Sequence, residues 1–286
     1  MRSIRWQWTG IWSWILGLFA LLTTAFPAHS DARSPQLQIA TYLRGDSLWH
    51  VDVYVALPEA WIAAQQLNDR SALYLELDLL SEGGKPLQRK QQKVYLKSTL
   101  TGLVRLPAQT SNFFQVGEGR YGIRAALKNE KNIIWTSEKI PLHLTRKRDQ
   151  LIFLSDLVPV AYPRISVPPF DAILWPKLQP ISDDFYLYYE IHSEVPDTFI
   201  TMMADLIDAN GRTIRHERYR LYVGEFSRQD YLRIQIRDIP AGDYTLILRA
   251  GESDSAVRKT FRFRVAHAYS VTELNPVSRI VWQRNR

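Results

Sequence analysis

Histidines are the side chains here with the broadest chemical use, because they bind metals and exchange protons near neutral pH. Five of the six lie beyond residue 30, and no two of these are within four residues of each other: His50, His143, His192, His216 and His267. Zinc ligands usually occur in close pairs, so this spacing predicts no metal site. The adjacent Asp183 and Asp184 lack the oxygen-rich spacing of a calcium loop, and we interpret them as a solvated turn.

Signatures of nucleophilic or acid–base catalysis are also absent from the sequence. There is no cysteine, and no serine occupies a Gly-x-Ser-x-Gly turn of the kind that exposes a hydrolase nucleophile. Glu190 occupies an outward strand position, and Asp205 and Asp208 flank a turn, so we interpret all three as surface charges. Glycine-rich phosphate-binding loops are missing. The sequence therefore predicts a non-catalytic protein without a cofactor.

Arginine is the most distinctive charged residue of the second half. The outward positions predicted from the strand pattern include five: Arg233, Arg237, Arg249, Arg262 and Arg264. Arginine forks match phosphate and carboxylate groups, which makes these residues candidates for binding a glycan or an anionic lipid. In an immunoglobulin-like order the first two belong to a different sheet from the other three, so no single anion-binding face is implied. Pairing with nearby acids on solvated faces is the simpler interpretation.

Aromatic residues mark a second candidate surface. Tyr186 and Tyr188 share the predicted outward face of one strand with Glu190 and His192. Exposed aromatic rings serve protein interfaces and sugar-binding platforms. Trp175 lies in the segment just before this strand, so packing between two units is the simplest interpretation, with partner binding and sugar binding as alternatives.

Alternation with a period of two runs through most of the sequence and indicates strands. In "ALYLELDLL" the leucines from Leu73 to Leu79 fall on one face, and "HVDVYVAL" has the same pattern from His50 to Leu57. The best helical candidate is residues 59–70, which fits either a short helix or an extended loop. The predicted fold class is all-β.

Two stretches of the chain correspond to each other, which indicates an internal duplication. "DLLSEGGKP" at Asp78 resembles "DLIDANGRT", which starts 127 residues later, and both contain a turn glycine. Two Gly-x-Tyr corners follow, Gly119/Tyr121 and Gly242/Tyr244. In immunoglobulin-like sandwiches a tyrosine at such a corner bonds the backbone a few residues upstream, so we interpret these residues as structural. The sequence predicts two tandem immunoglobulin-like, or fibronectin III-like, antiparallel β-sandwiches.

The N-terminus has the order of a secretory signal peptide: basic residues, an apolar run and a small-residue site. The predicted organisation is a signal peptide at 1–30, a first sandwich at 36–146, a proline-rich connector at 147–180, a second sandwich at 181–268 and a basic tail at 269–286. We expect a periplasmic or extracellular protein, with an uncleaved N-terminal membrane anchor as the alternative. The net charge of +7 is modest, and export argues against nucleic acid as a partner.

Several short motifs resemble the exported region of bacterial GWxTD-domain proteins: "LIFLSDLVPV" before a proline-rich stretch, "FYLYYEIHS", "DANGRTI" and "IPAGDYTLILRA" ahead of "RKTFRFRV". The resemblance covers most of residues 36–268 and implies export and paired β-sandwiches. The Gly-Trp-x-Thr-Asp motif itself does not occur, so the function of that domain does not transfer.

Together these features predict an exported, non-catalytic binding or scaffold protein of the bacterial cell envelope. Its expected partner is another envelope protein, recognised through a sheet face or an edge strand. A glycan or an anionic lipid is the other expected ligand class. The alternative function is a carbohydrate-binding accessory protein, or a hydrolase whose site is assembled from several loops.

Overall fold

The structure is a computed structural model that describes residues 34–45, 47–96, 99–101, 104–130, 132–146, 150–163, 173–252 and 256–267, with side chains from 99 to 106 left out. Strands dominate the described residues, and their only helix is α1 (Glu59–Ala64), so the all-β prediction is confirmed. No helix in these ranges has the length and apolar content to cross a membrane. The predicted signal peptide and basic tail lie outside the described residues.

The first half forms two antiparallel sheets that face each other across an apolar core. One sheet has the order β1 (Gln36–Arg44), β2 (Leu48–Leu57), β7 (Ala108–Val116). The other has the order β10 (Ile140–Leu144), β8 (Gly119–Lys128), β3 (Leu73–Ser81), β4 (Pro86–Val94), and β9 (Ile133–Thr136) also pairs with β8. A small hairpin, β5 (Thr99–Thr101) and β6 (Val104–Leu106), precedes β7.

The second half repeats this arrangement strand for strand. Its first sheet consists of β11 (Ile152–Leu154) and β12 (Val158–Val160), which both pair with β13 (Phe185–Ser193), and of β16 (Ser227–Ile234) on the other side of β13. Its second sheet has the order β15 (Thr213–Val223), β14 (Thr198–Asp208), β17 (Gly242–Ala250), β18 (Val257–Val265). Each sandwich thus pairs a smaller inner sheet, defined as β1-β2-β7 or β11/β12-β13-β16, with a larger outer sheet.

Residues 147–180 were predicted to be a proline-rich connector, but they contain two strands of the second inner sheet. β11 and β12 lie within residues 147–180 and together form the edge strand of the second inner sheet. Pro159 pairs opposite Leu187 in this edge, a position where proline is tolerated because no further strand needs its missing N–H. The apolar residues of the segment are buried, as expected of a stretch that lies against a sandwich; among them are Leu154, Val160 and Trp175.

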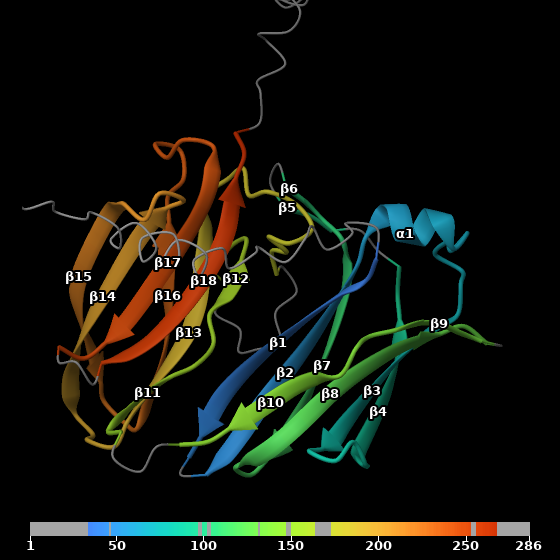
Figure 1. The fold of residues 1–286 in the computed structure, drawn as a ribbon, viewed down its shortest axis with the longest axis horizontal. Coiled ribbons are helices and arrows are strands. Elements are labelled where there is room, and N and C mark those ends of the chain that lie inside the picture. The colour runs from blue at the N-terminus through green and yellow to red at the C-terminus, as the bar shows by residue number, and fades with distance from the viewer. Residues whose placement is uncertain are drawn as a thin grey trace, which may run out of the picture.

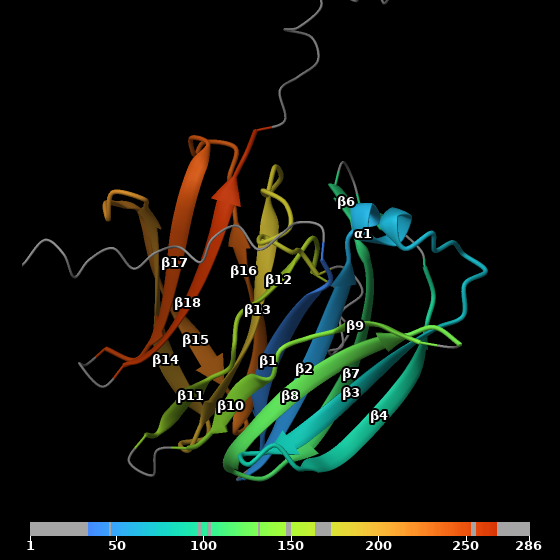
Figure 2. The same cartoon turned by 45° about the vertical axis from the view of Figure 1, so that its right-hand side comes forward.

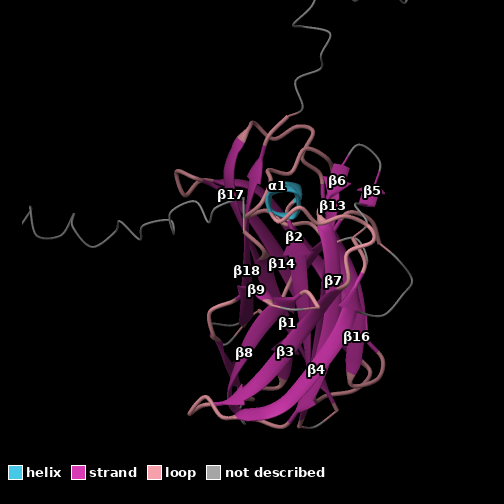
Figure 3. Cartoon of the chain, turned by 90° about the vertical axis from the view of Figure 1, so that its right-hand side faces the viewer, coloured by secondary structure: helices cyan, strands magenta, loops and turns pink. Residues whose placement is uncertain are grey.

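Four sheets lie in succession across the molecule, as Figures 1 and 2 show. The two inner sheets face each other in the middle, and an outer sheet covers each side. Three apolar cores fill the three spaces: one inside each sandwich and one between the inner sheets. The view in Figure 3 shows the strands running lengthwise, with α1 at one end.

The duplication extends to details of backbone geometry. The pairing of β3 with β4 shifts register between Leu79 and Leu80, and β14 with β15 shifts between Leu206 and Ile207, the corresponding positions. The turn glycines that follow, Gly84 and Gly211, have φ values of 84° and 79°. Only glycine adopts this left-handed conformation without strain, so both hairpins depend on it.

Both tyrosine corners are present. The hydroxyl of Tyr244 donates to the Pro240 carbonyl at 2.8 Å, and that of Tyr121 donates to the Gly117 carbonyl at 3.3 Å. Two residues before each tyrosine the glycine has φ of 156° or 158°, outside the range that L side chains favour. A Cβ on Gly119 would come within 3.1 Å of the Tyr121 ring, so the glycine lets the ring fold over the corner.

Replacing Tyr244 with Phe should lower the free energy of unfolding by about 1 kcal/mol, the usual net value of one protein hydrogen bond. The matched Tyr121→Phe change should cost about 0.5 kcal/mol or less, because this longer bond is exposed to water. Urea unfolding followed by fluorescence measures both changes. Equal costs at the two corners would contradict this difference.

A buried aspartate also recurs at corresponding positions of the two outer sheets. Asp78 on β3 accepts hydrogen bonds from Arg89 of β4 at 2.6 Å and Arg124 of β8 at 2.8 Å. Asp205 on β14 accepts from Arg249 of β17 and contacts His216 of β15 at 2.6 Å. In both sheets, one carboxylate therefore ties together three adjacent strands.

These bonds set the pH dependence of stability. Burial raises the pKa of Asp78, but the hydrogen bonds and charges of Arg89 and Arg124 together outweigh it and hold the pKa below its ordinary value. The pKa of Asp205 is lowered in the same way by His216 and Arg249 against the opposing effect of burial. A carboxylate with a lowered pKa in the folded state stabilises the fold above its unfolded pKa, and this contribution is lost as the pH falls through the folded pKa.

The free energy of unfolding should therefore decrease as the pH falls below about 4, near the ordinary aspartate pKa. Asp78→Asn and Asp205→Asn should each destabilise the protein at pH 6 and make the decrease below pH 4 shallower. Asp69→Asn, in the exposed turn after α1, is the matched control and should change neither quantity. Urea midpoints across pH 3 to 6 test this, and unchanged pH profiles in both variants would contradict it.

Candidate functional site

The two tyrosines proposed for binding lie between the sandwiches. Tyr188 is 1% exposed and belongs to the apolar core between the inner sheets. Its ring centroid lies 5.9 Å from that of Tyr42 on β1 and 5.3 Å from that of Tyr231 on β16. Tyr186 is half-buried at the margin of the same core. Tyr188 is thus a packing residue, not a residue of a free binding surface.

Glu190 corrects a second prediction, because it is a buried ionic contact between the sandwiches and not a surface charge. Its side chain is 5% exposed, and its two oxygens lie 2.8 and 2.7 Å from the guanidinium nitrogens of Arg44 on β1. The Tyr188 hydroxyl also donates to Glu190, and Gln229 donates at 3.3 Å. Burial, together with the neighbouring Glu190 carboxylate, raises the pKa of Tyr188 well above its usual value. The hydroxyl therefore stays protonated and remains a donor.

Asp156, between β11 and β12, joins the edges of the two inner sheets. Its Oδ2 accepts from the backbone N–H of Thr41 at 3.0 Å and from the Thr41 hydroxyl at 2.6 Å. The Asp156 N–H in turn donates to the Thr41 carbonyl at 3.2 Å. Lys259 of β18 donates to the other carboxylate oxygen at 2.6 Å. The break between β11 and β12 therefore allows an inter-sandwich bond.

The first inner sheet contributes a buried polar group of its own. Asp52 on β2 is fully buried, accepts from the Tyr54 hydroxyl at 2.8 Å and contacts His50 Nε2 at 2.8 Å. The His50 ring stacks on Phe113, with ring centroids 4.7 Å apart. Trp175 crosses between the sandwiches and donates to Gln109 at 3.2 Å. Asp52 and Trp175 thus each have a hydrogen-bond partner.

The five predicted arginines divide between two surfaces. Arg233 extends from β16 and pairs with Asp184 at 3.0 Å, and Arg237 lies in the turn after β16. The other three lie on the second outer sheet: Arg249 on β17, with Arg262 and Arg264 on β18. Arg264 pairs with Asp243 at 2.7 Å. The inference that they do not form a single face agrees with this placement.

Asp184, just before β13, connects this strand to β16 and the turn that follows β16. It accepts from the Ile236 backbone N–H at 3.0 Å as well as from Arg233. Burial acts to raise the pKa of Asp184, but these two donors and the charge of Arg233 lower it overall. In the described part of the chain, no three acidic, histidine or cysteine side chains gather closely enough to hold a metal.

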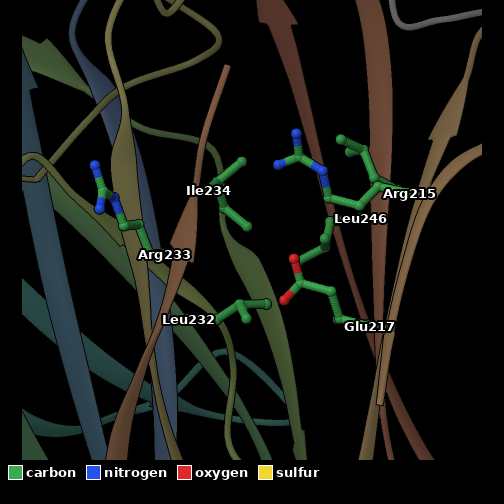
Figure 4. Close-up of a pocket in the computed structure, with 8 residues that line it drawn as sticks. Arg215, Glu217, Leu232, Arg233, Ile234 and Leu246 are labelled. Carbon is green, nitrogen blue, oxygen red and sulfur yellow. The ribbon is translucent and has the colours of Figure 1, made fainter. Parts of the chain in front are cut away.

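Described residues line a hollow in each sandwich. Figure 4 shows the smaller hollow, of about 20 Å³, where Arg215 and Glu217 of β15 face Leu232 and Ile234 of β16. Arg215 donates to the Gln235 carbonyl at 3.1 Å and so closes the open side of the sandwich. This volume admits about one water molecule. The larger hollow, of about 300 Å³, lies beside α1 between Ile62, Leu67 and Leu96.

An exposed surface on the second outer sheet was missed in the sequence. Arg218, Arg220 and Tyr222 alternate outward along β15, and Phe199 lies opposite Tyr222. The alternation of charged and aromatic residues was visible in "RHERYRLYV". Their assembly with the arginines of β17 and β18 requires the strand order, which the local pattern does not contain.

No protein-family model matches the sequence, and no curated protein matches it. Among solved structures, the chain is similar to part of dimeric latent PorU from Porphyromonas gingivalis, with 9% identity, a TM-score of 0.36 and coverage of 83% of this chain and 21% of that one. The BSP domain of a biofilm-associated protein is 13% identical, with a TM-score of 0.31 and coverage of 82% of this chain and 30% of that one. Red sea bream transglutaminase is 11% identical, with a TM-score of 0.25 and coverage of 81% of this chain and 31% of that one. This chain spans at most about a third of these proteins. Likeness at this level assigns neither a family nor an activity.

Removing Arg44 tests the contact between the sandwiches. Arg44→Ala should lower the free energy of unfolding by about 2–3 kcal/mol, because it leaves the Glu190 carboxylate buried without its counter-ion. Arg120→Ala, which breaks an exposed pair with Glu82, is the matched control and should cost about 0.5 kcal/mol or less. Urea unfolding measures both.

The double variant Arg44→Met/Glu190→Met should recover most of the loss, since it removes the unpaired charge and keeps apolar volume. Equal stability of Arg44→Ala and Arg120→Ala would contradict the assigned role of the buried pair.

Proposed function

We propose that this chain is an exported, non-catalytic binding or scaffold protein of the bacterial cell envelope that recognises another envelope protein. The observation that carries the proposal is the mutual burial of the two inner sheets. It joins the sandwiches into one body with both outer sheets facing away from each other (Figure 2). The resemblance of the sequence to exported paired sandwiches supports the same class.

The outer sheets supply the surfaces for recognition. Each ends in a long edge strand, β4 in the first sandwich and β15 in the second. Most residues of β4 are exposed, and its polar sequence discourages indiscriminate pairing with other strands. Such an edge suits the addition of one matching extended segment from a partner.

A second candidate, a carbohydrate-binding accessory protein, is favoured by one specific observation. Phe199 and Tyr222 are 56% and 42% exposed, and their ring centroids lie 5.2 Å apart on the second outer sheet. Neighbouring exposed rings are the usual means of binding sugar faces. A glycan array on the purified protein tests whether it binds sugars as well as a protein partner.

The proposal predicts both location and contacts in the cell. Mass spectrometry of the chain recovered from the periplasm should find an N-terminus near residue 31. A photo-crosslinking residue at Gln91 on the β4 edge should give a discrete protein adduct in intact cells. The same residue at Asp69, in the exposed turn after α1, is the control and should give none.

Three results would overturn the proposal: retention of the chain in the cytoplasm, no adduct at Gln91, or turnover of an envelope polysaccharide or ester by the purified protein. The last result would instead support the hydrolase alternative.

A further inference from the structure

The outer face of the second sandwich has an unusual arrangement of cations. Four residues form a row across β15, β14, β17 and β18, because adjacent members are directly opposite in the strand pairing: Arg218, Met203, Arg249 and Arg258. Arg249 and Arg258 are thus neighbours on the same face. Like charges directly opposite each other destabilise a sheet, so the fold alone gives no reason for this row.

Part of this positive charge has no ion-pair partner among the residues that the structure describes. Arg249 bonds to Asp205, and Arg218 pairs with Glu252 at 2.5 Å, where both side chains are more than 60% exposed. Arg220 and Arg258 are exposed and have no ion-pair partner among the described residues, and the same holds for Arg262. Six arginines lie on this face, and two aspartates lie among them, with Glu252 and Asp197 at the rim: Arg218, Arg220, Arg249, Arg258, Arg262, Arg264, Asp205 and Asp243.

The first sandwich provides an internal comparison, because it has the same sheet with the same register. The row that corresponds to the arginine row there is Gln91, Glu76, Ala126 and Thr136. It contains no arginine, and Glu76 occupies the position of Met203. The arginine row is therefore a property of the second copy and not a requirement of the fold.

Aromatic rings extend the basic face at one end. The Arg220 guanidinium lies 4.9 Å from the ring centroid of Phe199, which pairs opposite Tyr222. The Tyr222 hydroxyl donates to Asp197 at 2.8 Å and fixes the ring against the sheet. From Phe199 to Ile207 the face runs about 26 Å at the usual rise of a strand, the length of several sugar units.

We propose that this face, defined by Phe199, Tyr222, Arg218, Arg220, Arg249 and Arg258, binds an extended acidic polysaccharide. The inference rests on the proposed non-catalytic binding function and names a ligand class for one surface. The arginine forks bind carboxylate groups along the polymer, and the two rings stack on sugar faces.

An anionic membrane is the other polyanion that the charge would attract, but the shape of the face favours the polymer. Membrane binding uses apolar side chains that enter the lipid beside basic residues. Here the Tyr222 ring is held on the sheet by the hydrogen bond of its hydroxyl to Asp197. The Phe199 ring is covered by the guanidinium of Arg220. A long face with arginines spread over three of its four strands suits a flexible chain that lies along it.

The test uses the purified exported chain and three probes: polygalacturonate, neutral dextran and vesicles of phosphatidylglycerol. Affinity electrophoresis should show retardation by polygalacturonate that weakens with added salt, and none by dextran. Arg220→Ala/Arg258→Ala should weaken the binding about tenfold, since each lost charged contact is worth roughly 0.7 kcal/mol. Phe199→Ala should weaken it by about threefold or more.

The matched control is Lys93→Ala/Arg120→Ala, which removes two exposed cations from the first sandwich and should leave the affinity within about twofold of the original. Urea midpoints establish that all variants remain folded. Equal retardation of the original protein and the Arg220/Arg258 variant would overturn the inference. Equal binding to dextran, or binding only to vesicles, would overturn it as well.

Reducing ends released from polygalacturonate are measured in the same samples. Their release would overturn the proposed non-catalytic function itself, whereas failure to bind without release would overturn only the assignment of this face.

Discussion

The burial of the two inner sheets against each other is the constraint on which the rest of the structure depends. Nearly every residue of β2 and β13 is buried, so these strands are covered on both faces even though their sheets are antiparallel. An antiparallel sheet commonly leaves one face in water, and these two sheets avoid this only by facing each other. Separation of the sandwiches would expose Tyr42, Tyr54 and Tyr188 together.

Polar groups inside this contact determine how the sheets are placed. A purely apolar contact tolerates sliding, but Glu190 reaches Arg44 and Asp156 reaches Thr41 in only one arrangement. A shift of either sheet would leave a buried carboxylate without its partner, which is costly. The apolar layer thus supplies most of the attraction, and the ionic contacts select the register. The two outer sheets acquire a fixed relative position as a result.

The sequence predicted what local patterns determine. Alternation identified the strands, and the turn and corner glycines identified the duplication, because these features depend on neighbours a few residues away. Glu190 was misinterpreted because its counter-ion is Arg44, 146 residues earlier, and an outward position on one strand says nothing about what covers it. β12 was missed because proline argues against a central strand, and only the sheet order shows that this strand is an edge.

The arginine row lies on the outward face of an outer sheet, away from the contact between the sandwiches. In each sandwich the inner sheet is restricted by its contact with the other copy, so substitutions there must preserve packing and paired charges. The outward faces of the outer sheets carry no such restriction beyond the shared aspartates Asp78 and Asp205, which tie the strands together in both copies. The rows beside these aspartates have therefore diverged, to Glu76 in the first copy and to flanking arginines around Met203 in the second. The arginine row is thus a difference between the copies that their shared fold does not require.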